Sequence, residues 1–168
     1  MAVILFVGTI PYRPFESELM HNNRDFSTFS GLLRAALRVS PSSPEVGFLD
    51  MITDDVVFEF PYATPGMVRR IVGRDALAAH FTKFSELFEL ERLTLDAVHR
   101  TDENRTVVFE FSAAGRCVAT GRPYPQRYIS VVELREGLIA RYRDYWNPQV
   151  LLDAMGDTLV AFARESAS

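Results

Sequence analysis

Apolar residues recur at helical spacing in three segments of the first ninety residues. The pattern predicts a first helix that begins near Asp25 or Ser27, each a suitable cap, and ends at Ser40-Pro41. Ser43-Pro44 is expected to start a short second helix. A third helix is expected from Arg74 to Phe88. Its apolar stripe runs in steps of three and four residues and comprises Leu77, His80, Phe81, Phe84, Leu87 and Phe88.

A period of two replaces the helical period after residue 91. Four strands are predicted there, at Arg92–Arg100, Thr106–Cys117, Gln126–Leu134 and Leu138–Trp146. A shorter strand, Val56–Phe60, is predicted before the third helix. Asn147-Pro148 should end the last strand, and Gly156 is expected to end the first part of a helical tail. Helices followed by a meander of strands predict an α+β class, in which N-terminal helices pack on a curved antiparallel sheet. Such a cone-shaped arrangement leaves an apolar pocket between the layers.

The length of 168 residues fits a single domain, which we place at residues 25–168. Residues 1–24 are interpreted as an N-terminal extension. Its apolar stretch Ala2–Val7 is too short to span a membrane and has no preceding positive charge. The extension is either a strand or arm that packs on a partner, or the product of an upstream start with Met20 as the natural one.

The charge and the cysteine count of the chain argue against several classes of function. A net charge of −4 argues against a nucleic-acid partner, because phosphate binding needs a concentrated basic surface. The single cysteine, Cys117, allows no intramolecular disulfide, and no motif for a metal or nucleotide cofactor is present. These features predict a cytoplasmic protein without metal, cofactor or membrane contact. Thirteen phenylalanines can fill a core or line a pocket for a flat apolar or aromatic ligand.

Asp144 is the first candidate for catalysis. Alternation in the last strand places it on one face between Tyr142 and Trp146. Poor solvation between two aromatic rings disfavours the carboxylate and moves its pKa towards the range of an acid–base catalyst. A carboxylate that pairs with an arginine of a neighbouring strand, or lies on an exposed face, would fit the same pattern.

His80 is the second candidate, because it interrupts the apolar stripe of the third helix and histidine is suited to proton transfer near neutral pH. A buried neutral histidine that is bonded to the backbone would also explain it. The sequence does not place His80 beside Asp144.

Three motifs resemble the SnoaL-like proteins of the nuclear transport factor 2-like superfamily. They are the segment from Phe48 to Pro61, the helix start Gly73-Arg-Asp-Ala-Leu77, and the strand from Gly137 to Asn147-Pro148. The resemblance covers roughly residues 26 to 156 and implies the cone-shaped fold. It is strongest for the phenazine-biosynthesis A/B branch, whose third-helix histidine and last-strand acid correspond to His80 and Asp144.

Two departures from that branch affect the substrate. The branch's serine one turn after the histidine is Phe84 here, and its basic residue falls on Phe48. Loss of a cationic anchor argues against a phenazine precursor as substrate. The catalytic aspartate of ketosteroid isomerases falls on Phe60, so the resemblance does not imply their mechanism.

Two functions remain open. The first is a cofactor-free enzyme that isomerises, cyclises or condenses a small cyclic carbonyl or polyketide-like compound. Asp144 would be its acid or base, His80 its partner, and the substrate-binding walls would be Tyr142, Trp146, Phe60, Phe84, Phe58 and Tyr128. The second is a non-catalytic module that binds a small molecule or dimerises. A homodimer is expected in both cases, through the face that carries Arg141, Arg143 and Tyr145.

Overall fold

The computed structural model describes residues 24–38, 47–101 and 105–158, and in these ranges it contains three α-helices and one seven-stranded sheet. The strand order is β1-β4-β5-β6-β7-β2-β3. Neighbouring strands are antiparallel except for β2 and β7, which run parallel. The strands are β1 (Arg24–Phe26), β2 (Ile52–Glu59), β3 (Arg70–Val72), β4 (Phe88–Arg100), β5 (Thr106–Cys117), β6 (Gln126–Arg135) and β7 (Leu138–Trp146). The predicted α+β class with helices on a curved sheet is confirmed.

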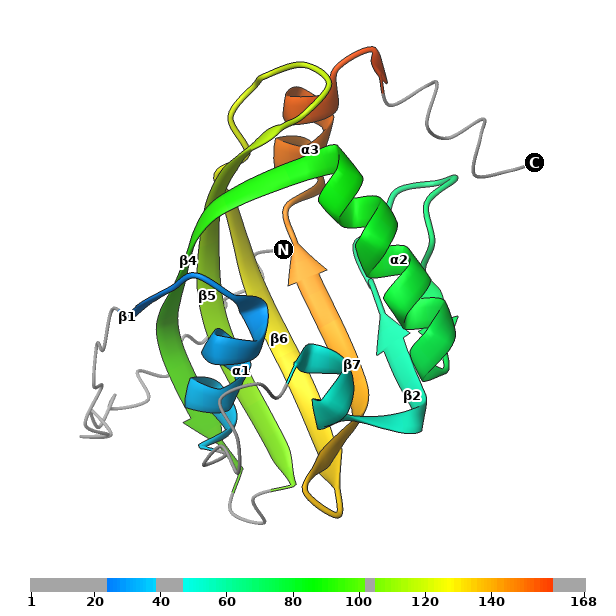
Figure 1. The fold of residues 1–168 in the computed structure, drawn as a ribbon, viewed down its shortest axis with the longest axis vertical. Helices are drawn as coiled ribbons and strands as arrows, with labels where there is room; N and C mark the ends of the chain where they lie inside the picture. The colour runs from blue at the N-terminus through cyan, green and yellow to red at the C-terminus, as the bar shows by residue number, and fades with distance from the viewer. Residues whose placement is uncertain (1–23, 39–46, 102–104, 159–168) are drawn as a thin grey trace, which may run out of the picture.

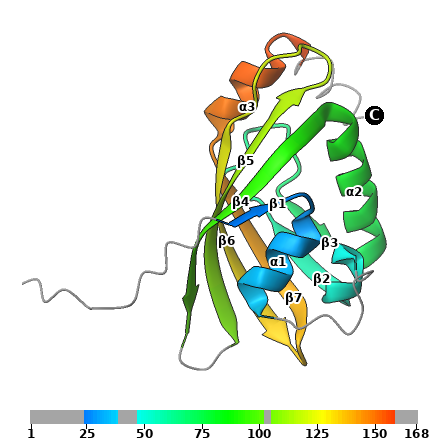
Figure 2. The same ribbon diagram turned by 60° about the vertical axis from the view of Figure 1, so that its left-hand side comes forward.

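In the described ranges the helices cover one face of the sheet and leave the other bare (Figure 1). They are α1 (Phe29–Leu37), α2 (Arg74–Leu87) and α3 (Pro148–Met155), with a 3₁₀ turn η1 (Phe48–Met51) before β2. Helix α1 and η1 lie over one end of the curled sheet, α2 runs along its side, and α3 sits at the opposite end (Figures 1 and 2). The inner face is therefore enclosed from three directions.

The N-cap of helix α1 lies one residue after Ser27 and three residues after Asp25, the two predicted caps. Thr28 is the N-cap, and its side-chain oxygen accepts a hydrogen bond from the backbone N–H of Gly31 at 3.1 Å. Asp25 cannot serve as the cap because it belongs to β1, which pairs with β4. The buried face of the helix consists of Leu32, Leu33, Ala36 and Leu37, which recur at the spacing of three and four residues that a helix requires.

The curl of the sheet depends on β4 and β5. Their register shifts twice, between Leu90 and Arg92 and between Leu95 and Ala97, and such bulges bend a strand pair. Gly115 lies opposite Leu90, where a Cβ atom would fall 2.2 Å from the backbone oxygen of Glu89. The close approach of the two strands at the bend therefore requires glycine.

Two apolar clusters form the interior. The larger one lies under α1 and includes Phe58, Phe109 and Tyr142, whereas the smaller one joins Phe88 and Tyr124 to α3. Aromatic rings make up much of both clusters, so the phenylalanines of the described residues lie mainly in the interior.

The strand bounds of β5 and β7 match the prediction, and Gly156 caps α3 as expected. Strand β2 begins at Ile52 rather than at Val56, and β4 begins directly at the end of α2 rather than at Arg92. The three-residue strands β1 and β3 were not predicted. The extension at residues 1–23, the predicted helix end Ser40-Pro41 and the helix start Ser43-Pro44 lie outside the described residues. No helix in the described ranges is long and apolar enough to cross a membrane.

Candidate functional site

A cavity of about 820 Å³ lies where the two apolar clusters meet. Its wall comes from α2, β3, the inner face of the sheet and α3. The volume is in the range of small-molecule sites. Most lining side chains are apolar, and the polar ones are Arg70, His80, Lys83, Ser85, Tyr124, Tyr128 and Asp144. The cavity can therefore hold an apolar molecule with few polar groups.

Asp144 is the carboxyl group that lines this cavity. Strand β7 alternates faces, so Asp144 shares the inner face with Trp146, and only 9% of its surface is exposed. Burial raises the pKa of Asp144 to about 7, against a smaller lowering by the hydrogen bond from Ser130. A carboxyl group with this pKa exchanges a proton easily at neutral pH, which is the requirement for a general acid or base.

Ser130 and Tyr142 form the polar contacts behind Asp144. Ser130 lies opposite Asp144 on β6, and its hydroxyl donates to Asp144 Oδ1 at 3.0 Å. The same hydroxyl is 2.7 Å from the Tyr142 hydroxyl. Tyr142 was predicted as a wall residue, but it is fully buried, stacks on Phe58 at 4.3 Å between ring centroids, and is not among the lining residues. The larger cluster under α1 occupies the space at this point of the strand.

His80 lines the same cavity from α2. Its ring lies 5.2 Å from that of Phe60, and its nitrogens have no hydrogen-bond partner among the described residues. Burial lowers the pKa of His80, and the nearby Lys83 charge lowers it further. The imidazole is therefore neutral at pH 7 and free to donate or accept one hydrogen bond to a ligand.

The structure thus places both predicted catalytic residues on one cavity, although their catalytic roles stay predictions. The predicted wall residues Phe58, Phe60, Phe84, Trp146 and Tyr128 also line it. In the described part of the chain, no group of three His, Cys, Asp or Glu side chains is arranged to hold a metal ion.

Two polar residues at the site were missed. Ser130 is on the inner face by alternation from Tyr128, a signal that the strand pattern contained. Tyr124 lies in the loop before β6, for which the sequence gives no orientation. Its hydroxyl is 3.0 Å from the Tyr128 hydroxyl, and both residues line the cavity. Burial raises the pKa of Tyr124 to about 12, so this phenol stays protonated at neutral pH.

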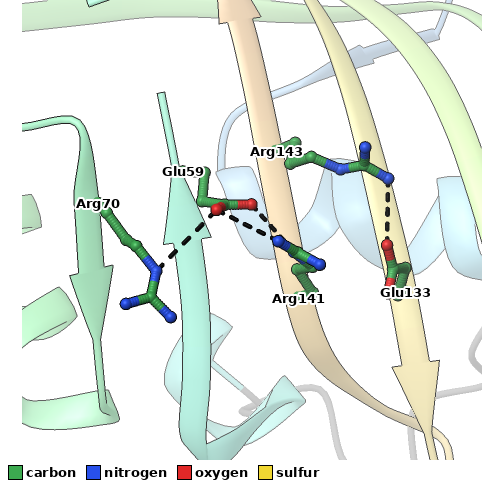
Figure 3. A network of polar contacts seen from close by, with 5 residues as sticks. All are labelled: Glu59, Arg70, Glu133, Arg141 and Arg143. Carbon is green, nitrogen blue, oxygen red and sulfur yellow. Dashed lines mark hydrogen bonds and ion pairs between the residues drawn. The ribbon is translucent and has the colours of Figure 1, made fainter. Parts of the chain in front are cut away.

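The bare face of the sheet carries a charged network (Figure 3). Arg141 donates to both carboxylate oxygens of Glu59 at 2.9 and 3.3 Å, and Arg70 approaches the same carboxylate at 4.0 Å. Arg143 donates to Glu133 at 3.1 Å. Asp144 is therefore not paired with either arginine of its own strand, because alternation directs those side chains to the opposite face.

Known proteins resemble this chain in sequence. The SnoaL-like domain model matches residues 45–142, which include helix α2 and reach into the last strand, β7. The uncharacterized protein YesE of Bacillus subtilis is 42% identical over 107 residues, which cover 64% of this chain and 73% of YesE. An uncharacterized PhzA/B-like protein of Pseudomonas aeruginosa is 35% identical over 125 residues, or 74% of this chain and 88% of that protein.

Solved structures agree with the sequence comparison. A Bacillus subtilis protein provisionally named an isomerase is 38% identical, with a TM-score of 0.65 over 76% of this chain and 91% of that one. NTF2-like proteins from Burkholderia, under 25% identical, share the fold. The cone-shaped sheet, the matched domain model and the PhzA/B-like relative agree, and the chain belongs to the SnoaL-like domain family.

Proposed function

We propose that this protein is a cofactor-free acid–base enzyme that moves a proton on a small cyclic carbonyl compound. One observation carries the proposal: Asp144, the carboxyl group on an otherwise mainly apolar cavity wall, has a pKa raised to about 7. At neutral pH the group is present both as carboxylate and as acid. It can therefore take a proton from carbon and return it without a metal or an organic cofactor.

The proposed reaction is a proton transfer from a substrate carbon to Asp144 and back. The Asp144 carboxylate takes a proton from the carbon beside the carbonyl, and the electron pair of that C–H bond becomes the double bond of an enolate. The negative charge then resides on the carbonyl oxygen. If a C=C bond of the substrate is conjugated with the enolate, Asp144, now an acid, returns the proton to the far carbon of that conjugated system, which isomerises the compound. Without such a bond, Asp144 returns the proton, or one exchanged with solvent, to the carbon that lost it. His80, neutral and without a hydrogen-bond partner among the described residues, orients the substrate or shuttles the proton.

The Bacillus subtilis relative that is provisionally named an isomerase supports a reaction of this class. The alternative is a module that binds an apolar molecule without chemistry. The cavity of about 820 Å³, which the phenylalanines line and do not fill, suits both functions. Among the described residues Asp144 is the buried carboxyl group, and its pKa near neutrality favours the enzyme, because an apolar ligand offers no charge to pair with it.

Deuterium exchange tests the proposal. The probe is 1-tetralone, a flat ketone whose carbon beside the carbonyl exchanges slowly on its own, incubated with the protein in deuterated buffer and followed by proton NMR. We expect the protein to accelerate exchange at that carbon, and Asp144→Asn to lose at least a hundredfold of the acceleration. Glu133→Gln, which removes a carboxyl group from the opposite face of the sheet, is the matched control. Equal exchange by Asp144→Asn and the unaltered protein would refute the role of Asp144.

A further inference from the structure

Tyr124 and Tyr128 bring two phenol hydroxyls together on the cavity wall. Their oxygens are 3.0 Å apart, and both residues line the cavity that contains Asp144. Tyr128 is held in place by Phe111, on which it stacks at 4.4 Å between ring centroids. Tyr124 is held by Phe88, whose ring lies 4.2 Å away. The hydroxyl pair is therefore a rigid feature of the wall.

The pair has one more hydroxyl hydrogen than the described residues accept. Two phenols carry two O–H hydrogens, and the bond between them uses one. Gln126 is the other polar side chain that bonds to Tyr124, and it lowers the pKa of that phenol, as a donor does. The carbonyl oxygen of Gln126 already accepts from the backbone N–H groups of Arg127 and Asn147. Among the described residues, the second hydroxyl hydrogen has no acceptor.

The register of β6 and β7 sets the position of the pair relative to Asp144. Ser130 lies opposite Asp144 and Tyr128 opposite Trp146, so Tyr128 and Asp144 are diagonal neighbours on one face. Diagonal neighbours in antiparallel strands have Cβ atoms roughly 7–8 Å apart. A six-membered ring is wide enough to place an oxygen at the hydroxyl pair while one of its carbons lies beside the carboxyl group.

The charge of the wall limits which oxygen can bind there. Besides the pair, this stretch of the wall holds the Asp144 carboxyl group, and the lining cations Arg70 and Lys83 come from the exposed elements β3 and α2. A ligand carboxylate at the pair would share this poorly solvated stretch of wall with the Asp144 carboxyl group, and repulsion between the two is unfavourable there. A neutral carbonyl oxygen accepts the free hydrogen without that penalty.

We propose that the Tyr124–Tyr128 hydroxyl pair is the binding site for the carbonyl oxygen of a flat, neutral cyclic ketone. The inference rests on the proposed function and names its substrate class. One tyrosine hydroxyl donates to the carbonyl oxygen, and the other donates to the first tyrosine. When Asp144 removes the neighbouring proton, the same hydrogen bond stabilises the charge that develops on the oxygen.

Paired probes test the site without relying on turnover. The affinities of 1-tetralone and of tetralin, which has the same rings but no carbonyl, are measured by calorimetry. One hydrogen bond in the cavity is worth about 1.4 kcal/mol, so we expect 1-tetralone to bind roughly tenfold more tightly. In the double variant Tyr124→Phe/Tyr128→Phe, the ratio of the affinity for 1-tetralone to that for tetralin should fall to about one. The infrared carbonyl stretch of bound 1-tetralone should move to higher wavenumber.

Tyr145→Phe is the matched control, because it removes a phenol hydroxyl from the other face of β7, where Tyr145 contacts Tyr62. Tyr145→Phe should bind 1-tetralone more tightly than tetralin by the same factor as the unaltered protein, with the same infrared carbonyl frequency for bound 1-tetralone. An unchanged preference and frequency in the double variant would overturn the proposal, as would failure of both probes to bind at millimolar concentration. If Asp144→Asn keeps the exchange activity while the double variant loses the preference, the proposed function fails and the oxygen site stands.

Discussion

Replacement of Asp144 by asparagine should stabilise the protein, and the gain should grow with pH. The folded protein raises the pKa of Asp144 from 3.8 to about 7. Between these values the folded state binds more protons than the unfolded state, so ionisation lowers stability as the pH rises. Each pKa unit corresponds to about 1.4 kcal/mol, which makes the penalty about 4 kcal/mol above pH 7. Asparagine keeps an acceptor for Ser130 and does not ionise.

Urea unfolding at a series of pH values measures this effect, with circular dichroism as the probe. The free energy of unfolding of Asp144→Asn minus that of the unaltered protein should be near zero at pH 4. It should then rise to about 4 kcal/mol at pH 8, which corresponds to roughly 8–16 °C in the melting temperature of a chain of this size. Glu133→Gln, which loses only a surface ion pair, should show no such rise. A difference that is independent of pH would refute the assignment of Asp144 as a buried, costly carboxyl group.

Three further predictions concern α2, the bend and the outer face. Burial and Lys83 lower the pKa of His80, so the folded protein should lose stability as the pH falls below 6.5, where the unfolded chain binds the proton more readily. Lys83→Ala should move the NMR titration of the His80 imidazole to higher pH. Gly115→Ala should lower the free energy of unfolding by about 2–3 kcal/mol, since its Cβ would overlap the backbone of β4. Gly47→Ala, where a Cβ meets its nearest atom at 3.5 Å, should change it little. Finally, we expect a homodimer through the outer face of the sheet, with Ile129→Lys giving a monomer by light scattering; a native monomer would contradict this.

The parts of the fold that the sequence predicts are those with a clear period. Strands β5 and β7 alternate over nine or more residues, and their bounds match. Strand β4 begins earlier than predicted, because Phe88 belongs to the helical stripe and is also the first strand residue. Strands β1 and β3 hold three residues each, too few for a period to be recognised, and their pairing with β4 and β2 comes from tertiary structure.

The site was predictable to the same extent. Alternation placed Asp144 and Trp146 together, and helical spacing directed His80 and Phe84 towards the interior. Neither period shows how deep a residue lies, and Tyr142 was therefore assigned to the wall although it packs in the core behind it. Tyr124 belongs to a loop, where direction is set by the packing of Phe88 and α3 and by no period of its own.

The energetics of Asp144 favour chemistry over simple binding. A domain of this kind has a net stability of about 5–15 kcal/mol, so a penalty of about 4 kcal/mol from one ionised carboxyl group is a large fraction of it. Asparagine at the same position would accept from Ser130 without this penalty, and an apolar residue would fit a cavity that merely holds an apolar molecule. A buried carboxyl group suits a reaction in which its proton leaves and returns, and burial gives it the pKa at which both steps are easy at neutral pH. Under the proposed function, the same burial that weakens the fold gives Asp144 the pKa of an acid–base catalyst, whereas a purely structural role would leave its cost in stability without a counterpart in function.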